Sequence, residues 1–178
     1  QRRRRCRRAV HLPRRRHVFV SEPFRGVGPQ EEPLLPPDGP FIWDLSNEVY
    51  FRPEEGGLLL SPCDESEPGD KGSESADPRH LDALREKLSR QFPSLSEFRV
   101  RRSWSGIRTL TPDGRFIVGH DPSLEGFFWV AGLGGHGVTC GYTVGELAAD
   151  LILHPERDRE NVHSPGRFAD AGRVGGDG

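Results

Sequence analysis

A glycine-rich stretch near the end of the 178-residue chain constrains its fold most. Residues 132–137 read Gly-Leu-Gly-Gly-His-Gly and match the dinucleotide-binding pattern G-x-G-x-x-G. The apolar run Phe127–Ala131 precedes them and a helical pattern from about Val138 to Leu153 follows, which predicts a strand, a turn and a helix that offers N–H groups to a ligand. A nucleotide-binding βαβ unit needs a second strand after its helix. The residues after Leu153 are rich in Gly, Pro, Arg and Asp and show no strand pattern. The match is therefore either accidental or part of a fold whose nucleotide-binding half is missing from this chain.

Composition favours a partial core with long polar segments. Only 33% of the residues are hydrophobic, and the chain has 22 glycines and 16 prolines. Residues 2–16 hold nine arginines and no acidic residue, so we expect 1–16 to be a disordered arm and 155–178 a disordered tail. No apolar stretch has the length of a transmembrane helix, and the arginine-rich start is unlike a secretory signal.

The cysteines indicate the compartment. Cys6, Cys63 and Cys140 are odd in number and form no C-x-x-C pair. This usage favours a reducing, cytoplasmic setting and argues against a disulfide framework or a zinc site. We therefore expect no metal.

The first half of the chain predicts an antiparallel meander. The expected strands are 17–21, 41–45, 48–52 and 58–60, with turns at 46–47 and 54–57. Residues 62–77 are acidic and rich in Ser and Gly, so they are expected to be solvated. Asp77 and Pro78 form a helix start, and the helix should end at Pro93.

The second half predicts two more strands before the glycine turn. They cover 98–104 and 116–119, separated by the turn Thr111–Gly114. The run 127–131 is expected to be a buried strand. Residues expected in the core are Trp104, Phe127, Phe128, Trp129, Cys140, Val144, Leu147, Ala148 and Leu151. Gly141 and Gly145 would let another group pack close to the last helix.

Three side chains have both a structural and a functional interpretation. Arg108 is either a surface ion-pair partner or a bidentate clamp on a substrate carboxylate. Tyr50 either packs on the sheet or closes over a substrate, and His136 is a turn residue without a sequence partner that would make it a base. The arginine arm could attract nucleic acid or an anionic membrane. It has no interleaved aromatic residues, so no nucleic-acid partner is expected.

Five stretches occur in a recognisable order. They are 14–20, 48–53, 57–62, 103–114 and 126–150. In this order and spacing, residues 14–154 resemble the C-terminal half of the D-amino-acid oxidase type of FAD-dependent oxidoreductases, a group that includes glycine oxidase and sarcosine oxidase. The group also includes the D-amino-acid dehydrogenases, and within it the pattern is most similar to D-arginine-dehydrogenase-like proteins.

The resemblance implies an α/β (α+β) fold in two parts. Residues 17–104 would be part of an antiparallel substrate domain, and 105–154 the C-terminal strand, turn and helix of a bipartite FAD-binding domain. The N-terminal Rossmann unit, which binds the ADP part of FAD in this family, would be missing.

The resemblance also implies site residues. Arg108 falls on a carboxylate-binding arginine, Tyr50 on a substrate-pocket tyrosine and Arg16 near a second carboxylate-binding arginine. The cofactor positions would be Gly106, Ile107, Gly134, Gly135, His136, Gly137, Val138 and Thr139. Relatives that attach FAD covalently have a cysteine near Gly106, so FAD should be bound non-covalently here.

The implied activity is oxidation of an amino acid or related amine. Hydride would pass from Cα to flavin N5, and the imino acid would hydrolyse to a 2-oxo acid. The alternative is a truncated, catalytically incompetent paralogue that acts as an interaction module. The residues leave oxygen or a quinone open as electron acceptor.

Overall fold

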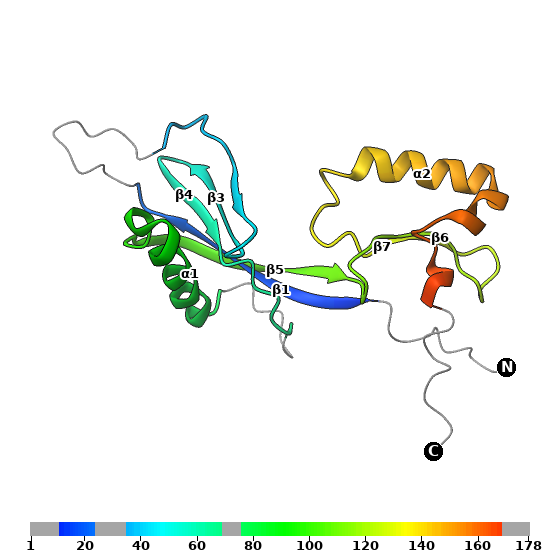
Figure 1. Ribbon diagram of the computed structural model, residues 1–178, viewed down its shortest axis with the longest axis horizontal. Helices are drawn as coiled ribbons and strands as arrows, with labels where there is room; N and C mark the ends of the chain where they lie inside the picture. The colour runs from blue at the N-terminus through cyan, green and yellow to red at the C-terminus, as the bar shows by residue number, and fades with distance from the viewer. Residues whose placement is uncertain (1–10, 24–34, 69–75, 169–178) are drawn as a thin grey trace, which may run out of the picture. The chain divides into compact units, whose positions relative to one another are not determined.

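The computed structural model divides the chain into two compact units (Figure 1). The structure describes residues 11–23, 35–68 and 76–168. One unit consists of residues 14–107, and the other contains residues 108–168 together with 11–13. The division at 107/108 lies close to the expected boundary at 104/105. Each unit is described by itself.

The unit formed by 14–107 contains a five-stranded sheet in the order β2-β3-β4-β1-β5. Its strands are β1 (Leu12–Ser21), β2 (Ile42–Asp44), β3 (Val49–Glu54), β4 (Gly57–Ser61) and β5 (Val100–Leu110). The pairs β2–β3, β3–β4 and β4–β1 are antiparallel, with Tyr50 opposite Ser61 and Phe19 opposite Leu60. The predicted antiparallel meander is confirmed for β2, β3 and β4, while β1 pairs with β4 and not with β2.

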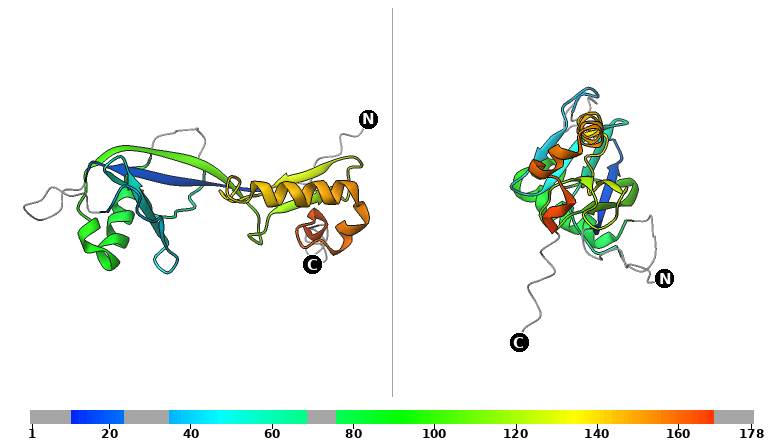
Figure 2. Two further views of the ribbon diagram at one scale, coloured as in Figure 1. Left: turned by 90° about the horizontal axis from the view of Figure 1, so that it is seen from above. Right: turned by 90° about the vertical axis from the view of Figure 1, so that its right-hand side faces the viewer.

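Helix α1 (Pro78–Gln91) covers one face of this sheet (Figures 1 and 2). Asp77 caps it by accepting a hydrogen bond from the Arg79 N–H at 2.9 Å, and Phe92 ends it ahead of Pro93. Leu84 and Leu88 are fully buried. They belong to the core that the sheet supplies with Phe19, Val49, Phe51, Leu58 and Leu60. The start, end and buried face of this helix follow the sequence pattern.

The second unit packs helix α2 (Gly141–Leu153) against the two-stranded sheet of β6 (Ile117–His120) and β7 (Phe128–Ala131) (Figure 2). Val118, Val144 and Leu151 form the centre of its core, and Leu147 and Ala148 pack against them. The predicted inner face of this helix is confirmed. The helix begins at Gly141, not at Val138, because residues 137–140 form a separate turn in which Cys140 N–H donates to the His136 carbonyl.

Several segments expected to be disordered or solvated are ordered. Strand β1 begins at Leu12, so the expected arm of 1–16 is wrong for residues 12–16, while 1–10 lie outside the described residues. The expected solvated segment 62–77 is wrong for 62–68, which contact β1 through polar groups. Such contacts leave no hydrophobic period in the sequence, which is why the pattern missed them.

The expected tail of 155–178 is also wrong in its first part. Short helices η2 (Pro155–Glu160) and η3 (Pro165–Phe168) follow α2. Asp158 accepts the His120 backbone N–H at 2.8 Å, and the Asn161 side chain donates to the Val118 carbonyl at 2.7 Å. These polar contacts dock the segment on β6. Residues 169–178 lie outside the described residues.

Two aromatic residues expected in the core are partly exposed. Trp104 is 36% exposed and Phe127 is 42% exposed, while Phe128 and Trp129 are partly buried. The expected buried strand is thus an edge strand, since β7 pairs only with β6 in the described sheet. No helix in the described ranges is long and apolar enough to cross a membrane.

Replacing Gly145 by alanine should stabilise the chain. A Cβ at this exposed position in α2 would meet no atom within 4 Å, and alanine is favoured over glycine in a helix interior by about 1 kcal/mol. Urea unfolding of Gly145→Ala should therefore show a higher midpoint than wild type. A Gly132→Ala control should lower it, because that Cβ would lie 2.6 Å from the Thr111 Cγ2 atom at a φ of +69°. A lower midpoint for Gly145→Ala would contradict the packing of α2 described here.

Candidate functional site

Arg108 lies against the glycine turn. A Cβ built on Gly135 would lie 2.7 Å from Cζ of Arg108 and 2.8 Å from its Nε, so the guanidinium occupies the space that a side chain at 135 would need. Within the part of the chain that the structure describes, no residue accepts a hydrogen bond from Arg108 or forms an ion pair with it. Arg108 is half-buried. A half-buried cation without an anionic partner fits a ligand carboxylate, for which the planar guanidinium is suited.

The turn is tied to the end of β5 by its own backbone. Gly134 N–H donates to the Thr109 carbonyl at 3.0 Å, and His136 N–H donates to the Leu133 carbonyl at 2.7 Å. Gly134 and Gly135 have φ angles of +56° and +94°, a region that favours glycine. The two glycines therefore allow the turn to pass close beside Arg108.

Residues 135–139 form an exposed segment ahead of α2. All five are exposed, and Val138 is 98% exposed. No acceptor among the described residues takes the backbone N–H groups of Gly137, Val138 or Thr139. Thr139 Oγ1 donates to the His136 carbonyl at 3.0 Å. These donors ahead of α2 fit the polar edge of a flavin, whose charge becomes negative on reduction.

The two other expected cofactor positions lie on β5. Gly106 is exposed and has no atom within 4 Å of a built Cβ, and Ile107 is 53% exposed. Neither has a contact that assigns it a role, so both remain predictions.

Tyr50 and Arg16 lie in the other unit, on the sheet face opposite α1. Alternation along β3 directs Val49 and Phe51 toward α1 and Tyr50 away from it. The Tyr50 ring is largely buried beside Phe41, with ring centroids 5.3 Å apart. This packing fits the structural interpretation of Tyr50, and the substrate role stays a prediction.

The Arg16 side chain is buried and is held by contacts with residues 64 and 65. It is 8% exposed, its Nε donates to the Asp64 carbonyl at 2.8 Å, and a terminal nitrogen lies 3.4 Å from the Glu65 carboxylate. A ligand carboxylate at Arg16 would have to replace these contacts. Arg16 is therefore less accessible than Arg108 in this conformation.

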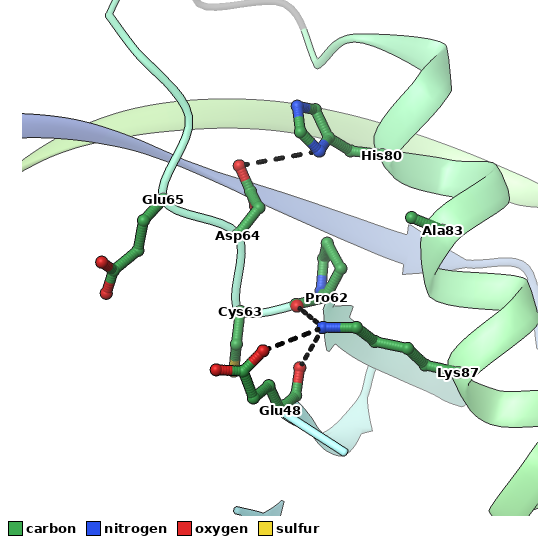
Figure 3. Close-up of a pocket in the computed structure, with 8 residues that line it drawn as sticks. All are labelled: Glu48, Pro62, Cys63, Asp64, Glu65, His80, Ala83 and Lys87. Atoms are coloured by element: carbon green, nitrogen blue, oxygen red, sulfur yellow. Dashed lines mark hydrogen bonds and ion pairs between the residues drawn. The ribbon is translucent and has the colours of Figure 1, made fainter.

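A histidine–carboxylate cluster lies beside Arg16, and no motif in the sequence indicated it. His17 of β1 and His80 of α1 stack with ring centroids 4.0 Å apart at an interplanar angle of 22°. Asp64 accepts from His17 Nδ1 at 2.7 Å and lies 3.8 Å from His80 Nδ1. His80 and Asp64 point toward each other, and both line a pocket of about 280 Å³ (Figure 3). Because the three residues are far apart in the sequence, only the fold brings them together.

The ring geometry disfavours a metal ion in this cluster. The three possible ligand atoms lie within 4.8 Å of one another, but a metal ion prefers to lie in the plane of each imidazole that binds it. Two rings stacked at 22° with centroids 4.0 Å apart have nearly parallel, separate planes, so one ion does not lie in the plane of both. The cluster is therefore better described as two imidazoles sharing one carboxylate.

The pKa of Asp64 lies below its ordinary value. Burial raises the pKa, but hydrogen bonds from the His17 backbone and ring and from the Ser66 hydroxyl outweigh that effect. Asp64 is thus an ionised acceptor at neutral pH, which makes His17 Nδ1 the donor of their hydrogen bond.

Solved structures show which fold class this architecture belongs to. L-proline dehydrogenase from P. horikoshii matches 90% of this chain with a TM-score of 0.68 and 21% identity, and glycine oxidase from Geobacillus kaustophilus matches 81% with a TM-score of 0.58 and 22% identity. The chain therefore has a mixed α/β fold of the FAD-dependent oxidase class. It covers 41% and 35% of those two proteins.

Sequence comparison gives the family. The pattern of the FAD dependent oxidoreductase family, DAO, matches residues 3–151. The chain belongs to this family of FAD-dependent oxidoreductases, as its motifs predicted. Glycine oxidase of Bacillus subtilis (strain 168) is 29% identical over 66% of this chain, and FAD-dependent oxidoreductase domain-containing protein 1 of Xenopus laevis is 28% identical over 79%. The matches cover 31% and 28% of those proteins, so the chain spans about a third of their length.

Proposed function

We propose that this chain supplies substrate-binding and flavin-edge residues of an enzyme that oxidises an amino acid or a related amine. The observation that carries the proposal is the guanidinium of Arg108, which has no partner among the described residues and lies against the exposed glycine turn. Bound FAD would supply the chemistry by accepting a hydride from the substrate Cα. The residues of this chain would contribute position and electrostatics.

Arg108 would bind the substrate carboxylate through two parallel hydrogen bonds. This contact fixes the orientation of Cα, which is attached directly to the carboxylate. The N–H groups of Gly137, Val138 and Thr139 would interact with the flavin edge in the same unit. Tyr50 and Arg16 are further candidates by resemblance, and a variant of each would test it separately.

We propose that FAD is bound non-covalently. Gly106 stands near the position at which covalently flavinylated relatives have a cysteine, and it offers no nucleophile. Acid precipitation of the complete flavoprotein should therefore leave all the yellow colour in the supernatant. Colour that stays with the precipitate would contradict this prediction.

Anaerobic mixing tests the proposed activity. A complete protein that contains this chain and the FAD-binding portion found in its relatives should lose its oxidised-flavin absorption when an amino acid is added. The amount of 2-oxo acid should equal the amount of reduced flavin. Flavin that stays oxidised with a broad panel of D- and L-amino acids and N-methylated glycine would contradict the proposal and favour a non-catalytic interaction module.

A further inference from the structure

The glycine turn at 132–137 contacts the end of β5 at more than one point. Besides the contact of Gly135 with Arg108, a Cβ built on Gly132 would lie 2.6 Å from the Thr111 Cγ2 atom. Thr111 directly follows β5 and is 4% exposed. A shift of Thr111 would therefore move the surface on which the glycine turn lies, and with it the space beside Arg108.

Thr111 opens a second turn, residues 111–115, which is closed by its own residues. Gly114 N–H donates to the Thr111 carbonyl at 3.1 Å, and Thr111 Oγ1 donates to the Arg115 carbonyl at 2.7 Å. Arg115 N–H donates to Asp113 Oδ1 at 3.2 Å. These bonds fix the shape of the turn, but they do not tie it to another element.

Arg167 of η3 ties this turn to the C-terminal segment. Its Nε donates to Asp113 Oδ2 at 2.8 Å, and Nη2 donates to Asp113 Oδ1 at 3.2 Å and to the Arg115 carbonyl at 3.0 Å. Nη1 donates to the carbonyls of His163 and Ser164 at 2.7 and 3.0 Å. The guanidinium thus joins the two segments through a bidentate ion pair, and its side chain is only 17% exposed.

This link has no substitute within the part of the chain that the structure describes. Arg167 is the only described residue outside the turn that forms a hydrogen bond or an ion pair with residues 111–115. Its hydrogen bond also holds the pKa of the Asp113 carboxyl well below its ordinary value. Both sides of the link are therefore charged at neutral pH.

The C-terminal segment has further anchors on β6. Val118 N–H donates to the His163 carbonyl at 3.0 Å, Asp158 accepts the His120 N–H, and Pro165 is buried. Loss of the Arg167 side chain should therefore leave this segment on β6 and release only the turn 111–115.

We propose that Arg167 is a positioning residue for Arg108. By holding the turn 111–115, it keeps Thr111 against Gly132, and the glycine turn then stays beside the Arg108 guanidinium. Arg167 lies beyond residue 151, where the match to the oxidoreductase family ends. The importance of Arg167 for substrate binding rests on the proposed function, whereas its link to the glycine turn does not.

Amide hydrogen exchange on this chain tests the link without flavin. The two reporters are Gly114 N–H, which donates within the turn, and Gly134 N–H, which donates to the Thr109 carbonyl at 3.0 Å. In Arg167→Ala the protection factors of both should fall at least about tenfold, because a hydrogen bond to a charged group contributes more than one tenfold step in an equilibrium. Arg159→Ala removes an exposed arginine of the same segment and should leave both unchanged.

Kinetics of the complete flavoprotein separate positioning from a merely structural role. Arg167→Ala should raise KM for an amino acid by a smaller factor than Arg108→Ala, and should leave KM for the uncharged amide and the limiting rate of flavin reduction near wild type. Arg167→Lys keeps the charge but not the planar fork, so it should restore part of the binding. Loss of stability alone would lower the amount of folded enzyme without changing KM.

Gly134 protection equal to wild type in Arg167→Ala would overturn the proposal, even with lost Gly114 protection, since Arg167 would then hold only the turn 111–115. An unchanged KM for the amino acid would overturn the role in substrate binding. If Arg167→Ala fails to fold, Asp113→Asn decides, because it removes the charge on the other side and should also lower Gly134 protection; full protection there would overturn the link. Failure of the proposed function would appear instead as flavin that amino acids do not reduce, and it would leave the exchange result unchanged.

Discussion

Arg108→Ala in the complete flavoprotein is expected to raise KM for a carboxylate-bearing amine about 10- to 150-fold. A hydrogen bond to a charged group contributes about 1.5–3 kcal/mol to binding. Each 1.4 kcal/mol of lost binding free energy changes the affinity roughly tenfold. The guanidinium has no other partner among the described residues, so little folding energy should be lost with it. Steady-state kinetics with an amino acid and with its uncharged amide would measure the effect.

The controls separate charge from geometry. Arg108→Lys keeps the charge but loses the planar fork and should lie between wild type and alanine. Arg115→Ala removes an exposed arginine from the turn that follows β5 and should leave KM unchanged. An Arg108→Ala enzyme with wild-type KM for the amino acid would show that the carboxylate is bound elsewhere.

Gly135→Val should damage both the stability of the turn and substrate binding. Gly135 has a φ of +94°, which lies in a region that a β-branched residue rarely adopts. The Cβ of the introduced valine would lie 2.7 Å from Cζ of Arg108. Backbone strain of this kind costs about 1–3 kcal/mol, and the clash displaces the guanidinium. Urea unfolding of this chain should show a lower midpoint, and the complete enzyme should show a raised KM similar to that of Arg108→Ala.

Gly145→Ala is the matched control for this substitution. It places a Cβ on another glycine of the same unit, but in open space, and it should raise the midpoint. A Gly135→Val protein as stable as wild type, with an unchanged KM, would contradict the contact between the glycine turn and Arg108.

Local signals in the sequence predicted the regular elements well. Helix α1 begins after the capping residue Asp77 and ends before the helix-breaking residue Pro93. Its apolar residues Leu84 and Leu88 lie in the core. The glycine turn was predicted because glycine spacing between a strand and a helix has a direct structural cause.

Polar docking and exposure could not be predicted in the same way. Residues 62–68 and the segment of η2 and η3 are ordered by hydrogen bonds between residues far apart in the chain, such as Asp158 with His120. Phe127 immediately precedes β7 and is 42% exposed although it lies in an apolar run, because exposure depends on the tertiary arrangement, which hydropathy does not carry.

The candidate site was predictable in part. Arg108 was identified by resemblance, and its contact with Gly135 and lack of a partner in the described chain became visible only in the fold. The stacked pair His17 and His80 had no signal, because single histidines on a strand and a helix are common and their meeting depends on how α1 packs on the sheet.

The central claim is that the complete protein removes hydride from the Cα of a carboxylate-bearing amine positioned by Arg108. The most direct measurement is the anaerobic single-turnover rate of flavin reduction with an amino acid deuterated at Cα, compared with the unlabelled amino acid. The account predicts slower reduction by the deuterated substrate at saturation, and a higher substrate concentration for half-maximal rate in Arg108→Ala. Flavin that no amino acid reduces, or reduction that is equally fast with both isotopes and unaffected by Arg108→Ala, would contradict it.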